Sequence, residues 1–129
     1  MWAQPIEKRS VPRKQIDELR MITHNVLNDR PFSNQWQDQF FRQWISVRPD
    51  ILHLQEIYSH STQETQELIE TCLGGTWFSA GHNDCKTISR YPITGSWSID
   101  GNLAVLIDTT ASIGTPMLCI NAHFPCCSN

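Results

Sequence analysis

One predicted strand ends in a carboxylate at a position that alternation assigns to the same face as the strand's leucines. The segment ILHLQEIY, residues 51–58, places Glu56 at the same parity as Leu52 and Leu54. Because side chains alternate along a strand, we expect Glu56 to point toward the face that the two leucines bury. An unpaired carboxylate on that face is unfavourable, so the sequence predicts that a cation or several hydrogen-bond donors meet it.

Two further segments change from apolar to polar toward their C-terminal ends. Residues 19–27 lead to Asn25, and residues 117–124 lead to Asn121 and His123. In layered α/β proteins, ligand sites gather at strand ends and in the loops that follow them. We therefore expect an amide, a carboxylate and an imidazole to meet at the tips of these strands.

These groups together suit chemistry on a phosphate ester. Mg²⁺ prefers one or two carboxylates, water and substrate phosphate, so Glu56 is a candidate metal ligand. Asn25 would orient that carboxylate or bond a substrate oxygen, and His123 would donate to a phosphate oxygen. The residues alone leave a second interpretation open, in which the asparagines close turns, His123 is an ordinary buried histidine and Glu56 faces an arginine.

The elements that position these residues alternate between strand and helix in the first half of the chain. Apolar spacing predicts a helix over residues 36–47, and Ser61 with Glu64 matches a capping box that starts a second helix. Gly74 and Gly75 end that helix. The order β-α-β-α followed by four short strands predicts an α/β fold. The strands are predicted at residues 19–27, 51–56, 76–80, 86–90, 103–108 and 117–124.

Composition and charge indicate one globular domain with its own core. The chain has 129 residues, 40% of them apolar and 18% charged, and no apolar run has the length of a membrane span. Residues 1–18 are predicted to form a polar leader without the apolar stretch of a signal peptide, which favours a cytoplasmic location. Five cysteines without a C-x-x-C spacing indicate reduced thiols. A net charge of −3 argues against tight nonspecific binding of long nucleic acid.

Four motifs carry a family resemblance that covers residues 19–124. The motifs are THNVLND (23–29), DILHLQEI (50–57), SRYPI (89–93) and NAHF (121–124). In their order and at roughly their spacing, the chain resembles the endonuclease/exonuclease/phosphatase superfamily. The resemblance implies a four-layer α-β-β-α sandwich with mixed sheets, incomplete here because residues 19–129 match only the N-terminal half of such a domain. It also implies hydrolysis of phosphodiester or phosphomonoester bonds with Mg²⁺, or Mn²⁺ in its place.

The resemblance assigns roles residue by residue. Glu56 matches the family's metal-binding glutamate, and Asn25 matches the asparagine beside it in the metal site. His123 matches a histidine that contacts phosphate. Catalysis is thus expected at Asn25, Glu56 and His123, and substrate binding at Asn25, Asn121 and His123. The substrate would be a phosphate ester of a nucleic acid, as in a nuclease, of a lipid headgroup or of an inositol phosphate.

The chain departs from the family pattern near its first motif. His24 stands where the family often has Trp or Tyr. Leu27 stands where some members carry an aspartate, and Asp29 is the nearest substitute.

The family's late motifs are missing. Nothing after His123 matches the family's Gly-Asp-x-Asn turn or its Asp-His pair, which supplies the general base. The turns at Asn83-Asp84 and Asp100-Gly101 precede the histidine strand and are out of order. We therefore expect a fragment of a longer protein that lacks turnover on its own.

The missing half also predicts exposed apolar surface. Without the rest of the second sheet, an apolar face beside open strand edges would attract a second chain, so we expect self-association. The residues expected on this face are Met21, Leu52, Leu54 and Met117.

Two other classes of function compete with the enzyme. One is a noncatalytic interaction module that keeps the scaffold and loses the chemistry, although the retention of an amide, a carboxylate and an imidazole together argues against it. The other is a zinc site built from His82, Cys85 and the Cys126-Cys127 pair, whose spacing suits zinc poorly.

Overall fold

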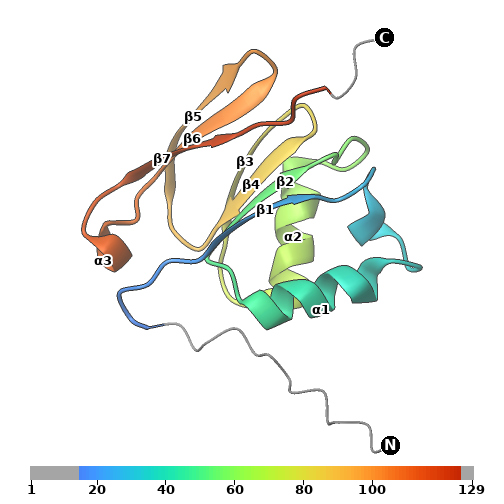
Figure 1. Cartoon of the computed structure of the whole chain (residues 1–129), viewed down its shortest axis with the longest axis horizontal. Helices are drawn as coiled ribbons and strands as arrows, with labels where there is room; N and C mark the ends of the chain where they lie inside the picture. The colour runs from blue at the N-terminus through green and yellow to red at the C-terminus, as the bar shows by residue number, and fades with distance from the viewer. Residues whose placement is uncertain (1–14, 126–129) are drawn as a thin grey trace, which may run out of the picture.

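The computed structural model describes residues 15–125 and has a mixed α/β fold with two sheets and three α-helices (Figure 1). The predicted α/β class is therefore confirmed. Of the predicted leader, residues 15–18 are exposed around a turn, and residues 1–14 lie outside the described part. Within the described residues the longest helix has 12 residues, and none is long and apolar enough to cross a membrane.

The first sheet brings several chain segments to one of its ends. Its strands, in spatial order, are β1 (Met21–Asn25), β2 (Ile51–Gln55), β4 (Cys85–Ser89) and β3 (Phe78–His82). β1 and β2 run parallel, whereas β4 runs antiparallel to both β2 and β3. The C-terminal ends of β1 and β2 and the turn between β3 and β4 therefore lie at the same end of the sheet.

Two helices cover one face of the first sheet. They are α1 (Gln37–Val47), which follows a short 3-10 helix η1 (Arg30–Phe32), and α2 (Thr62–Leu73). The predicted capping box is confirmed, because the Glu64 N–H donates to Ser61 Oγ at 3.1 Å and the Ser61 N–H donates to Glu64 Oε2 at 2.7 Å. Gly74 ends α2 with a φ of 68°, a conformation that glycine adopts without strain.

The second sheet covers the other face of the first. It is antiparallel, in the order β5 (Ile93–Ile99), β6 (Asn102–Ile107), β7 (Met117–Asn121), and α3 (Thr110–Ile113) joins its last two strands. Five strands thus follow α2, so the prediction of four is wrong. β5 escapes prediction because Gly95 and Pro92 indicate a turn, whereas pairing with β6 holds the segment extended with an irregularity at Gly95.

The two faces of β2 enter different cores. Leu52 and Leu54 are fully buried beneath the helices, so the expectation that they line an exposed face is wrong. Ile51 points the other way, into the core between the two sheets. Met21 is half exposed and lies with Met117 along a cleft between the edge strands β1 and β7. Apolar surface beside open strand edges is therefore found at this cleft, on the second sheet and at Phe78 of the edge strand β3.

The outer face of the second sheet is apolar and uncharged. None of its three strands contains a charged residue. Trp97, Leu118 and Ile120 on this face are 51%, 64% and 61% exposed. An uncharged apolar face beside an open edge favours association of sheets.

We expect concentration-dependent self-association through this face, and a charge on it should oppose the contact. Leu118→Lys should weaken association about tenfold or more, because burial of one such side chain contributes about 1.5 to 3 kcal/mol. Sedimentation velocity of the purified chain measures this effect. The matched control is Ile45→Lys, on the exposed side of α1. Equal association of both variants would place the contact elsewhere.

Candidate active site

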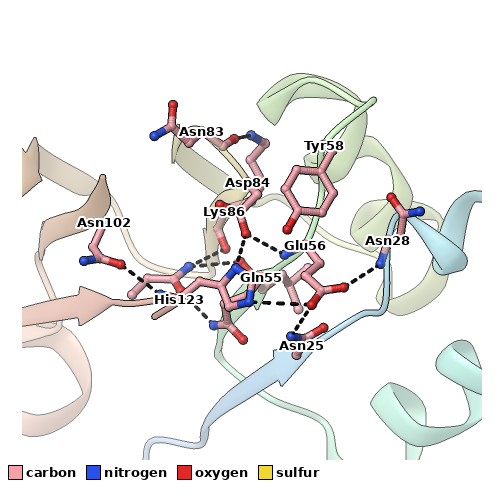
Figure 2. A network of polar contacts seen from close by, with 12 residues as sticks. Asn25, Asn28, Gln55, Glu56, Tyr58, Asn83, Asp84, Lys86, Asn102 and His123 are labelled. Carbon is pink, nitrogen blue, oxygen red and sulfur yellow. Dashed lines mark hydrogen bonds and ion pairs between the residues drawn. The ribbon is translucent and has the colours of Figure 1, made fainter. Parts of the chain in front are cut away.

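Three side chains named from the sequence meet at the shared end of β1 and β2 (Figure 2). Asn25 Nδ2 donates to Glu56 Oε1 at 2.8 Å. His123 follows β7 of the other sheet, and its Nε2 lies 3.5 Å from the same oxygen. The amide, carboxylate and imidazole therefore form one polar cluster, as their positions at strand ends predict.

Glu56 reaches this cluster because the backbone leaves the strand before it. β2 ends at Gln55, and Glu56 has a φ of 66°, in the left-handed region that residues other than glycine rarely adopt. Its side chain therefore does not follow Leu52 and Leu54 toward the helices, and the orientation predicted from strand alternation is wrong. Ile57 is buried against the helices in its place. The carboxylate keeps 22% exposure at the sheet end.

The loop after β1 provides a second donor to this carboxylate. Leu27, Asn28 and Asp29 have φ angles of 54°, 57° and 60°. The left-handed conformation costs roughly 1 to 2 kcal/mol for a residue such as Leu27, whereas Asn and Asp adopt it more readily. Part of the compensation comes from the Asn28 N–H, which donates to Glu56 Oε2 at 3.0 Å. The Leu27 N–H donates to Asn25 Oδ1 at 3.0 Å, which fixes the orientation of the Asn25 amide.

Asp29 ties the loop after β1 to the loop after β2. It accepts the backbone N–H groups of Tyr58 and Ser59 and pairs with His60 Nδ1 at 2.9 Å. Burial acts to raise the pKa of Asp29, but the bonds from His60, Ser59 and Tyr58 outweigh it and lower the pKa overall. The carboxylate proposed as the nearest substitute for a family aspartate is thus occupied in holding these two loops together.

Asp84 orients His123, and the sequence analysis did not identify it as a site residue. Asp84 Oδ2 accepts from the Glu56 N–H at 3.0 Å and lies 2.6 Å from His123 Nδ1. The Asp84 carboxylate thus occupies Nδ1 of His123 and leaves Nε2 facing Glu56. Asn102 Oδ1 also accepts the His123 N–H at 2.9 Å. The only sequence signal was the Asn83-Asp84 turn, which indicates a hairpin but not the strand beside which it folds.

Charged groups of both signs contribute to the electrostatics of the cluster. Tyr58 is 58% exposed, and its slight desolvation followed by the negative charges of Asp84 and Glu56 raises its pKa; its ring lies beside both carboxylates in Figure 2. Lys86 is the nearby cation, and it donates to the backbone carbonyl of Asn83. Burial lowers the pKa of Lys86, although Asp84 acts in the opposite direction. The cluster thus holds two carboxylates, with Lys86 near Asp84 and the His123 ring in contact with both.

Asn121 lies inside the molecule, where it joins the two sheets. It is 1% exposed, and its Nδ2 donates to the carbonyls of Leu54 and Lys86 at 3.2 and 3.0 Å. Its Oδ1 accepts from Gln55 Nε2 at 2.7 Å. The structure therefore brings Asn25, Glu56 and His123 together but keeps Asn121 beneath them, where its bonds fix the end of β7.

His24 points away from the cluster, toward the helices. Its Nδ1 accepts from Trp44 Nε1 at 3.2 Å, and its ring packs against Phe40. Burial lowers the pKa of His24, which agrees with a neutral imidazole that accepts this bond. The residue that departs from the family pattern is thus used to dock α1 on the sheet.

Glu56 is the residue of this cluster that could contribute to a magnesium site. A carboxylate offers about four acceptor positions, and Glu56 uses one for Asn25 and one for Asn28. Asn25 Oδ1 is engaged by Leu27, so orientation of Glu56 is the role of Asn25 that the geometry supports. Among residues 15–125, no group of three or more His, Cys, Asp or Glu is arranged to hold a metal by itself. Mg²⁺ is commonly bound through one or two carboxylates with water and substrate phosphate, which agrees with this donor set.

The zinc alternative gains no support within the described part of the chain. His82 Nε2 is bonded to Ser98 Oγ at 3.0 Å, and Cys85 is fully buried. Cys126 and Cys127 lie outside the described residues.

Comparisons of the chain with protein-family models, with curated proteins and with solved structures find no match. The resemblance to the endonuclease/exonuclease/phosphatase superfamily therefore rests on the four motifs and enters below as a proposal.

Proposed function

We propose that this chain carries the metal site of a phosphoester hydrolase of the endonuclease/exonuclease/phosphatase type. The observation that carries the proposal is the convergence of Asn25, Glu56 and His123, with Asp84 as orienting partner, at one end of the first sheet. Five of the seven non-glycine residues with positive φ in the described chain surround this cluster, in line with strain held at a functional site. They are Leu27, Asn28, Asp29, Glu56 and Asn83.

The proposal extends to the fold. We propose that the two sheets belong to a four-layer sandwich in which further helices cover the second sheet. The exposed Trp97, Leu118 and Ile120 on its outer face support this, because a sheet face of that composition is normally buried.

Glu56 is the proposed ligand of the catalytic cation. Asn25 and Asn28 hold its carboxylate in place, so that little reorganisation is needed when a cation arrives. Bound Mg²⁺ or Mn²⁺ would neutralise charge on the phosphate oxygens and position the ester.

His123 is the proposed proton-transfer and phosphate-binding residue. Asp84 holds Nδ1, so Nε2 is the atom available to a phosphate oxygen or a water molecule. The 3.5 Å between Nε2 and Glu56 Oε1 exceeds a strong hydrogen bond and leaves these atoms able to bind separate parts of a substrate. The chemistry fits any phosphate ester, whether its alcohol is a nucleotide, a lipid headgroup or an inositol.

Replacement of Glu56 by glutamine tests the metal site. We expect the wild-type chain to bind Mn²⁺ with one ion at this site, and Glu56→Gln to lower the affinity about 100-fold or more, because loss of supporting groups alone costs 10- to 100-fold. Electron paramagnetic resonance of free Mn²⁺ measures the affinity, and Mg²⁺ should displace the bound ion.

The matched control is Glu67→Gln on the exposed side of α2, which should bind Mn²⁺ as the wild type does. If Glu56→Gln retained full Mn²⁺ affinity, the enzyme proposal would fail and the noncatalytic module would become the better interpretation.

A further inference from the structure

A second group of potential ligand atoms lies between the edge strands of the two sheets, apart from the Glu56 cluster. Met21 of β1, His53 of β2 and Cys119 of β7 line a cleft of about 490 Å³. His53 Nε2 lies 3.1 Å from Met21 Sδ, and Cys119 Sγ lies 4.0 Å from the same sulfur. Three segments that are far apart in sequence thus bring a thioether, an imidazole and a thiol together.

The two separations from the Met21 sulfur are those of ligand atoms around one ion. For comparison, a zinc ion holds imidazole nitrogen at about 2.0 Å and sulfur at about 2.3 Å, which places its ligand atoms roughly 3 to 4 Å from one another. The separations of 3.1 and 4.0 Å fall at the two limits of that range. Met21 is 48% exposed, so the cleft is accessible to an ion from solvent.

The protonation states suit metal binding. His53 Nδ1 is bonded to Thr87 Oγ1 at 2.9 Å, which leaves Nε2 directed at the Met21 sulfur. Burial lowers the pKa of His53 to about 4, so its ring is neutral at pH 7. Burial also raises the pKa of the Cys119 thiol, so a metal ion would have to displace one proton from it.

We propose that Met21, His53 and Cys119 bind one soft monovalent cation, of which Cu(I) is the biological representative. Thiolate and thioether ligands select Cu(I), and imidazole suits it, whereas Mg²⁺ requires oxygen ligands. The site is therefore chemically independent of the Glu56 cluster. Binding releases the Cys119 proton to solvent and involves no change of oxidation state.

Titration of the reduced full chain with Ag(I), a redox-inert probe for Cu(I), tests the site. All proteins carry Cys126→Ser and Cys127→Ser, because those two thiols also bind soft ions. We expect one Ag(I) per chain with release of one proton, measured by calorimetry in two buffers. Met21→Leu and Cys119→Val should each weaken binding about 100-fold while preserving side-chain size.

Two variants serve as matched controls. Met117→Leu removes a thioether that lines the same cleft, and Cys72→Ala removes a half-buried thiol that faces Phe41. Both should bind Ag(I) as the background protein does, and circular dichroism should show all variants folded. The proposal is overturned if the background protein binds no Ag(I). It is equally overturned if Met21→Leu and Cys119→Val bind as tightly as the two controls.

Discussion

Replacing His123 with alanine should lower the rate of phosphodiester cleavage by about 10² to 10⁴, the usual contribution of a positioned acid or base. The side chain is the one imidazole whose Nε2 faces the Glu56 carboxylate in the described chain, and Asp84 fixes its orientation. Hydrolysis of bis(p-nitrophenyl) phosphate in the presence of Mn²⁺ measures the effect.

Asp84 should act through His123. Asp84→Asn keeps the size of the side chain but exchanges an acceptor for a donor on one side, so we expect a 10- to 100-fold loss of rate. A shifted pH–rate profile would distinguish this positioning role from loss of stability. Asp100→Asn, an exposed carboxylate in the turn between β5 and β6, is the matched control and should leave rate and profile unchanged.

If the wild-type chain shows no measurable turnover, the comparison moves to binding of inorganic phosphate with Mn²⁺ present, which isothermal calorimetry measures. His123→Ala should weaken phosphate binding about tenfold or more, because a hydrogen bond to a charged group contributes about 1.5 to 3 kcal/mol. Unchanged phosphate affinity and unchanged rate in His123→Ala would remove this residue from the proposed site.

The meeting of Asn25 and Glu56 could be predicted because it follows from simple geometry. β1 and β2 are parallel neighbours, so polar residues just beyond their apolar parts must lie at the same end of the sheet. The orientation of Glu56 could not be predicted, because strand alternation applies only while the backbone stays extended. Glu56 has a φ of 66°, so the backbone is no longer extended there and strand alternation does not give the direction of its side chain.

Asp84 shows a different limit of sequence reasoning. Its importance depends on β4 pairing with β2, which brings the turn between β3 and β4 to the end of β2. Local sequence indicates the turn but carries no information on which strand becomes its neighbour. The same holds for Asn102, whose contact with His123 depends on β6 pairing with β7.

Asn121 was a predicted substrate contact, but its burial makes a large effect on stability the expected result. Asn121→Leu should lower the free energy of unfolding by about 3 to 5 kcal/mol. Each buried group left without a partner costs roughly 1 to 3 kcal/mol. The substitution removes the bonds of Asn121 to the carbonyls of Leu54 and Lys86 and to Gln55, whose Nε2 keeps its bonds to Thr23 and His53.

Urea unfolding followed by tryptophan fluorescence measures the change. Gln63→Ala, on the exposed side of α2, should stay within about 0.5 kcal/mol of the wild type, as surface substitutions normally do. A loss below 1 kcal/mol in Asn121→Leu would contradict the role of Asn121 as the polar link between the sheets. A large loss of unfolding free energy would also explain why the site needs a buried amide beneath it, because His123 lies only two residues after Asn121. The Asn121 amide holds the end of β7 in a position from which the His123 imidazole reaches Asp84 and Glu56.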